Sequence, residues 1–182
     1  MPAPDAMATP TETADRSAQQ VSSCRIEAVD LDRDQHRRAL VALLDEYAQT
    51  PEGGGQALAP SVRQALVPVL AARSHYFGWL AFVDGDAVGL VNCFEGVSTF
   101  RARPLLNVHD IIVSAGFRRR GIARALLTRV EEHARAAGCC KLTLEVLEAN
   151  RAARAAYSAS GFRPYALDPA MGQALFFEKP LV

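Results

Sequence analysis

The order of apolar patterns along this 182-residue chain predicts an α/β fold, more narrowly an α+β mixed sheet flanked by helices. Three observations support this class. Strand-like and helix-like apolar patterns are interleaved from residue 24 onward. Apolar residues make up 49 % of the chain and charged residues 22 %, which is the composition of a globular protein. The length suits one domain with a core of its own.

The first 22 residues differ from the rest, because they are rich in Pro, Ala, Thr and Ser. They lack the basic start and the apolar run of a signal peptide, so we expect a disordered tail at 1–22 before one domain at 23–182. No stretch approaches the run of about 18 apolar residues that a membrane span needs. We therefore expect a cytoplasmic protein that has no membrane partner.

The N-terminal half of the domain is predicted to hold a strand and two helices. Cys24–Val29 alternates like a strand. Apolar residues at helical spacing predict helices over residues 34–49 and 61–73, and Pro68 should kink or interrupt the second. Between them, Thr50–Pro60 contains prolines and three consecutive glycines, which keep it out of either helix.

The middle of the chain gives the clearest strand pattern. Trp79–Val83 and Ala87–Phe94 are apolar and flank an Asp-Gly-Asp turn, which predicts a β-hairpin. Pro104–Val113 follows as an apolar strand interrupted by three polar residues. An apolar repeat every four residues then predicts a helix over residues 121–137.

The C-terminal part continues the alternation of strands and helices. Cys140–Val146 is apolar on one face, which predicts a strand, and residues 150–160 predict a short helix. Gly138 and Gly161 stand where a helix ends. The segment 161–179 predicts a last pair of strands.

Charge and cysteine content exclude several classes of function. Lys+Arg and Asp+Glu both number 20, so the formal net charge is zero. A protein that binds the nucleic-acid backbone usually carries a basic excess, so we expect no nucleic-acid partner. The four cysteines form no CxxC pair and no zinc-finger spacing with histidine, so no metal site is predicted. We expect small buried thiols in a reducing compartment.

An arginine-glycine turn is the strongest local feature, and it lies in the stretch FRRRGIARALL at Phe117–Leu127. The turn follows a predicted strand and begins a predicted helix, where backbone N–H groups lack partners and the helix dipole is positive. An anion fits there, and Gly121 lets it approach without a Cβ in the way. No GxxxxGK[ST] or GxGxxG motif is present. Alone, the turn favours a solvated helix start.

Two motifs together resemble the GNAT N-acetyltransferase superfamily. Arg118–Ala123 is similar to its Q/R-x-x-G-x-G/A signature, which also follows a strand. Asn150–Phe162 is similar to its second element and lies at the expected distance. The resemblance covers roughly residues 23–182. Ala123 stands where Gly is commoner, which the family pattern allows.

The resemblance implies a GNAT-like fold whose fourth and fifth strands splay apart, with acetyl-CoA as cosubstrate in the cleft between them. The pyrophosphate would lie on the arginine-glycine turn, and the pantetheine arm would pair with the preceding strand like an added strand. The residues implied to bind acetyl-CoA are Ile111, Ile112, Val113, Arg118, Arg119, Arg120, Gly121, Ile122, Ala123, Arg124, Asn150, Ala153 and Tyr157.

Asn150, Ala153 and Tyr157 are spaced i, i+3 and i+7, so they share one face of the predicted helix. From the residues alone, Asn150 is an N-cap candidate and Tyr157 a half-buried core tyrosine. The resemblance implies that Asn150 hydrogen-bonds the CoA arm. It also implies that Tyr157 protonates the departing thiolate as a general acid.

Acetyl transfer also needs a base, because an amine with a pKa of about 10.4 is mostly protonated at pH 7. His109 and Asp110 lie just before the expected cofactor strand, and several subfamilies place an acidic base or substrate ligand there. Neighbouring strand residues point to opposite faces unless a bulge intervenes, so we expect only one of the two to face the cleft. Otherwise Asp110 anchors a loop and His109 packs against a helix. Glu95 and Glu145 are weaker candidates.

These features imply an acetyl-CoA-dependent N-acetyltransferase, a monomer or homodimer, that uses Tyr157 with Asp110 or His109. The acceptor would be a primary amine that attacks directly in a ternary complex. The loops Thr50–Gln56, Phe94–Pro104 and Asp168–Gly172 should surround it, and they do not choose between a small molecule and a protein or peptide. The alternative is a non-catalytic acyl-CoA-binding sensor domain on the same fold.

Overall fold

The structure is a computed structural model that describes residues 24–166, 168, 170, 172 and 174–181. The tail predicted at residues 1–22 lies outside the described residues. The strands are β1 (Arg25–Ala28), β2 (Tyr76–Val83), β3 (Asp86–Ser98), β4 (Arg103–Val113) and β5 (Leu142–Leu144). The helices are α1 (Asp34–Ala48), α2 (Pro60–Ala71), α3 (Ile122–Ala136) and α4 (Arg151–Ala159), with short 3-10 helices η1 (Pro51–Gly53) and η2 (Ala115–Phe117).

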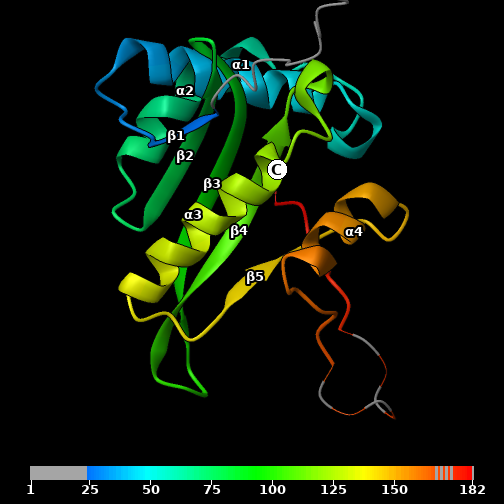
Figure 1. Ribbon diagram of the computed structural model, residues 1–182. Coiled ribbons are helices and arrows are strands. Elements are labelled where there is room, and N and C mark those ends of the chain that lie inside the picture. The colour runs from blue at the N-terminus through cyan, green and yellow to red at the C-terminus, as the bar shows by residue number, and fades with distance from the viewer. Residues whose placement is uncertain (1–23, 167, 169, 171, 173, 182) are drawn as a thin grey trace, which may run out of the picture.

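One mixed sheet organises the fold, with the strand order β1-β2-β3-β4-β5. The first three pairings are antiparallel, and β4 and β5 are parallel because α3 connects them as a crossover. In Figure 1, α3 crosses one face of the sheet while α1 and α2 lie against the other. The mixed sheet flanked by helices confirms the predicted fold class.

The core consists of two apolar layers, one on each face of the sheet. On the α3 face, five helix residues are buried against β2, β3 and β4: Ile122, Leu126, Leu127, Val130 and Ala134. On the opposite face, Leu40 and Leu43 of α1 and Leu70 of α2 pack on Leu80 and Leu90. Full burial of such a side chain contributes about 1.5–3 kcal/mol. The four-residue repeat read from the sequence therefore identified the correct face of α3.

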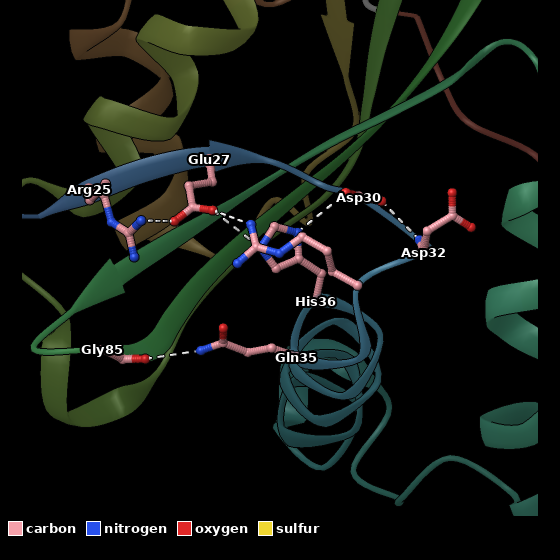
Figure 2. A network of polar contacts seen from close by, with 8 residues as sticks. Arg25, Glu27, Asp30, Asp32, Gln35, His36 and Gly85 are labelled. Carbon is pink, nitrogen blue, oxygen red and sulfur yellow. Dashed lines mark hydrogen bonds and ion pairs between the residues drawn. The ribbon is translucent and has the colours of Figure 1, made fainter.

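A polar network fixes the start of α1 to the edge strand β1, as Figure 2 shows. His36 is fully buried, its Nδ1 accepts a hydrogen bond from the Asp30 N–H at 3.0 Å, and its Nε2 lies 3.4 Å from the Glu27 carboxylate. Glu27 also accepts from Arg33 at 2.8 Å and contacts Arg25. The Arg33 hydrogen bond is the main cause that lowers the pKa of Glu27. The network attaches the first turn of α1 to β1, and α1 also contacts β4.

β4 and β5 separate, as the resemblance implied. They pair only at Leu106↔Leu142, Asn107↔Thr143 and Val108↔Leu144. β5 ends there, whereas β4 continues to Val113. Figure 1 shows β5 diverging from β4 toward α4. The second half of β4 therefore has an open edge on the β5 side.

The ends of the two C-terminal helices confirm their sequence signals. The side chain of Asn150 accepts a hydrogen bond from the Ala153 N–H at 3.0 Å, so Asn150 caps α4. Gly138 and Gly161 follow α3 and α4 with φ of 71° and 87°, the left-handed conformation of a helix-terminating glycine.

Three sequence expectations need correction. The described residues of the segment 161–179 form no strand, contrary to the predicted pair. Pro164 lacks an N–H to donate, and β5 offers only a three-residue edge. The strand predicted at Cys140–Val146 is shorter than expected, because only Leu142–Leu144 pair with β4. Pro68 does not interrupt α2, because Pro68 and Gln64 are both exposed and water can reach the carbonyl that loses its partner.

Candidate active site

The turn between β4 and α3 is a cluster of free backbone N–H groups. Arg119 and Gly121 have φ of 66° and 80°, whereas Arg120 between them does not have a positive φ. This alternation turns successive N–H groups toward one side of the chain, as in anion-binding nests. Among the described residues, no hydrogen bond is donated by the N–H groups of residues 119–124. A Cβ built on Gly121 would meet nothing within 4 Å, so the space over the turn is open.

The arginines around this turn have different surroundings. The Nε of Arg118 donates a hydrogen bond to the Val113 carbonyl at 3.1 Å, so the arginine that leads the family signature braces the loop. The guanidinium of Arg120 lies 5.0 Å from the Phe117 ring centre. Arg119 and Arg124 are exposed. Their charges make the turn electropositive, which favours a phosphate at the helix start.

The backbone of β4 next to the turn presents its polar groups to the open edge. The Ser114 N–H donates to the Val88 carbonyl at 2.9 Å, toward β3. The direction of the backbone polar groups alternates along a strand, so the N–H and C=O groups of Ile112 also point to β3. Those of Ile111 and Val113 point to the opposite side. Two of the three predicted strand residues therefore face the open edge, where the Val113 carbonyl already accepts the hydrogen bond from Arg118. The backbone of Ile112 is thus not exposed at the open edge, and its side chain is buried against α1 and α2.

A β-bulge places both His109 and Asp110 on the face covered by α1 and α2. Asn92 pairs with Asp110 and Cys93 with Val108, so His109 is the extra residue in β4. Val108 packs in the α3 layer, and Ile111 packs against that same layer. The alternation that would send the two side chains to opposite faces, expected unless a bulge intervenes, is therefore not found, because the bulge shifts it by one residue.

The Asp110 carboxylate is held by a chain of buried polar groups. Its Oδ2 accepts from the Asn92 amide at 3.0 Å, and the Asn92 Oδ1 accepts from the Tyr76 hydroxyl at 2.9 Å. Asn92 is only 2 % exposed, and burial raises the pKa of Tyr76. A hydrogen-bonded chain of this kind fixes the carboxylate in place. His109 is exposed and lies edge-on to the Phe94 ring, with 5.4 Å between the ring centres.

Tyr47 interacts electrostatically with several titratable groups, and sequence reasoning missed it. Burial raises its pKa, and the carboxylates of Asp110 and Glu52 raise it further. Burial also raises the pKa of Tyr157 to about 12, with Tyr47 as the second cause. Tyr47 is thus linked electrostatically to both Asp110 and Tyr157. Its position just before the glycine-rich loop is the one signal that could have drawn attention to it.

Tyr157 is half-buried and packs against Phe162, with 6.0 Å between the ring centres. It shares its helix face with Asn150, as predicted, and Asn150 uses its Oδ1 for the helix cap. Because the cap uses only this oxygen, the amide nitrogen of Asn150 can donate a hydrogen bond to another acceptor.

The remaining acidic candidates lie elsewhere. Glu95 is near Cys139, whose pKa is raised by burial and then by the Glu95 charge. Glu145 is exposed just beyond β5. In the part of the chain that the structure describes, no group of three or more His, Cys, Asp or Glu side chains could hold a metal ion. No helix there is long and apolar enough to cross a membrane.

We expect Tyr157→Phe to lower turnover about 100-fold or more while acetyl-CoA affinity is retained, because a positioned acid contributes about 10²–10⁴-fold. A raised pKa keeps the phenol protonated to higher pH. Deprotonation of Tyr157 should therefore not lower the wild-type rate below about pH 10, the ordinary pKa of tyrosine. Steady-state kinetics against pH measure both effects, with Tyr165→Phe at an exposed tyrosine as control. An unchanged rate at every pH would remove Tyr157 as the acid.

The splayed sheet, the N–H-lined turn and the acidic residue that precedes the open strand edge define one class of fold and site. Residues 37–162 match the model of the acetyltransferase (GNAT) family, so the chain belongs to that family. The match confirms the resemblance drawn from the two sequence motifs.

Three named proteins illustrate the relationship. Streptothricin acetyltransferase of Streptomyces lavendulae is 38 % identical over 90 residues, which cover 50 % of this chain and 46 % of that protein. An aminoglycoside acetyltransferase, HMB0005, from an uncultured soil metagenomic sample has a TM-score of 0.70 at 22 % identity, covering 88 % and 99 % of the two chains. The aminoglycoside N-acetyltransferase AAC(6')-Iy in complex with CoA has a TM-score of 0.66 at 18 % identity, covering 87 % and 95 %. The chain thus matches less than half the length of its curated relative, and the two structures show the fold.

Proposed function

We propose that the chain transfers an acetyl group from acetyl-CoA to a primary amine of a small cationic molecule. The observation that carries the proposal is the position of Asp110, whose carboxylate is held by Asn92 and which directly precedes Ile111 and Val113 of the open edge in β4. An acyl group delivered along that edge would arrive next to a base. The complex of AAC(6')-Iy with CoA supports acetyl-CoA as cosubstrate.

The cofactor would bind through the groups already described. Its pyrophosphate would accept hydrogen bonds from the N–H groups of residues 120–124, with the charge of Arg119 and Arg124 nearby. Its pantetheine arm would pair with Ile111 and Val113, and the Asn150 amide would contact the arm. The remaining predicted contacts, at Ile122, Ala123 and Ala153, leave room because their side chains are small or turned into the core.

The reaction would proceed by direct attack. Asp110 takes a proton from the acceptor ammonium, and the neutral amine attacks the thioester carbonyl. The C–N bond forms, the C–S bond breaks, and the CoA thiolate leaves with a proton from Tyr157. The second proton of the attacking nitrogen then passes to the Tyr157 phenolate, which leaves a neutral amide and restores the phenol. A backbone N–H at the open edge of β4 would stabilise the oxyanion.

The chemistry of the acceptor side favours a small cation. Asp110 lies near the aromatic side chains of Tyr47 and Tyr76, and Phe94 and His109 continue this surface. Aromatic faces and a carboxylate attract ammonium groups. The names of the similar proteins, which refer to streptothricin and aminoglycosides, agree with this choice.

The test is the release of free CoA thiol from acetyl-CoA in the presence of single acceptors. We expect release with multiply charged amino sugars or polyamines, and little with peptides that offer one N-terminal amine. Release with peptides alone would overturn the choice of acceptor. If acetyl-CoA binds tightly but none of the acceptors causes thiol release, the result would favour a non-catalytic sensor domain.

A further inference from the structure

The last turn of α1 connects two loops that are far apart in the sequence. The Tyr47 hydroxyl donates to the Glu52 carbonyl at 3.3 Å, and the Asp45 carboxylate accepts from the Leu58 N–H at 2.7 Å. Both bonds hold the loop after α1. Glu46, between these two residues, reaches the other way, to the loop between β4 and α3.

Glu46 makes two hydrogen bonds to that loop. Its Oε2 accepts from the Ser114 hydroxyl at 2.7 Å, and its Oε1 accepts from the Ala115 N–H at 3.2 Å. Glu46 is half-buried, and no ion pair within the described part of the chain involves it. Its carboxylate is therefore stabilised by hydrogen bonds from uncharged donors and not by an opposite charge. Hydrogen bonds to an ionised carboxylate are stronger than neutral ones, so the loop is held firmly at this point.

The bonded residues lie directly before the proposed pyrophosphate turn. Ser114 follows β4, Ala115 begins η2, and the chain then reaches Arg118 and Gly121. The Arg118 bond to Val113 braces the same loop from its other end. Any shift of Ser114 or Ala115 would move the N–H groups that follow. A misplacement of about 1 Å in a group that positions a ligand is enough to lose much of its effect.

We propose that Glu46 is a positioning residue for acetyl-CoA, which holds the loop from Ser114 to Gly121 against α1 so that its N–H groups meet the pyrophosphate. The inference rests on the proposed function. Glu46 does not touch the cofactor in this account, because both of its oxygens are used by the loop. A carboxylate repels phosphate, so its favourable effect acts through geometry and not through charge.

Two variants separate geometry from charge. Glu46→Ala removes both bonds and should weaken acetyl-CoA binding about tenfold or more, the value expected when charge-assisted hydrogen bonds are lost. Glu46→Gln keeps the shape, because its amide oxygen can accept from Ala115 and its NH₂ can donate to the Ser114 oxygen. Its affinity should stay within about threefold of wild type. The rate at saturating acetyl-CoA should change much less than the KM for acetyl-CoA.

The measurements are calorimetric titration with acetyl-CoA and exchange of the Ala115 amide hydrogen in the chain without ligand. Exchange should accelerate in Glu46→Ala and stay slow in Glu46→Gln. Glu132→Ala, which removes an exposed carboxylate paired with Arg129, is the control and should change neither quantity.

Several outcomes would overturn the inference. Wild-type affinity in Glu46→Ala would do so even if its thermal stability fell, because Glu46 would then be structural only. Tighter binding in both variants would show that the charge matters and the geometry does not. If the wild-type chain does not bind acetyl-CoA, the proposed function fails and the inference with it. Binding by wild type and equally by Glu46→Ala would overturn this inference alone.

Discussion

Gly121→Val is expected to abolish acetyl-CoA binding while the sheet and both apolar layers stay folded. Gly121 has φ of 80°, a conformation that a β-branched residue adopts only at a cost of about 1–3 kcal/mol. Its missing Cβ faces open space, which is where the pyrophosphate would approach the backbone. Loss of several N–H contacts to an anion, each about 1.5–3 kcal/mol, corresponds to a drop in affinity of about 100-fold or more.

The same loop offers a matched control for this variant. Gly116 also faces open space, but it does not have a positive φ. Gly116→Ala should therefore bind acetyl-CoA within about twofold of wild type, as expected for a neutral surface substitution. Calorimetry measures the dissociation constants, and circular dichroism checks the fold. Wild-type affinity in Gly121→Val would remove the turn as the pyrophosphate site.

Asp110→Asn should lower kcat/KM for the amine about 10²–10⁴-fold, the usual contribution of a positioned base. The asparagine oxygen can still accept from the Asn92 amide, so the 3.0 Å hydrogen bond and the fold should survive. What the variant loses is the charge that binds the ammonium and takes its proton. Its residual rate should rise with pH up to about 10, because only the neutral amine then reacts.

The measurement for Asp110→Asn is acetyl transfer against pH at saturating acetyl-CoA. Acetyl-CoA affinity, measured separately, should not change, because the carboxylate is assigned to the acceptor side. Glu95→Gln is the matched control, since Glu95 lies near Cys139 on the α3 face. A full rate in Asp110→Asn, or an equal loss in Glu95→Gln, would contradict the assignment of Asp110 as base.

The sequence predicted the parts of the fold that depend on local pattern. The apolar repeat of α3, the hairpin turn at Asp84–Asp86 and the Asn150 cap are decided by residues close together in the chain. The candidate phosphate turn could be predicted for the same reason, because a strand end, a glycine and a helix start are consecutive.

Long-range features were not predictable in this way. The bulge at His109 is a property of the pairing between β3 and β4, and it decides that Asp110 and His109 share a face. Tyr47, Tyr76 and Asn92 come from α1, β2 and β3, and no motif links them to Asp110. The described residues of the predicted C-terminal strands form no strand, because apolar alternation requires a partner edge and β5 provides only three residues.

A crystal structure of the chain with CoA tests the central claim most directly. We expect pyrophosphate oxygens within hydrogen-bonding distance of the N–H groups of residues 120–124. We also expect the pantetheine arm to pair with Ile111 and Val113 and the thiol to lie between Asp110 and Tyr157. A pyrophosphate bound away from Gly121, or a thiol on the far side of β5, would contradict it.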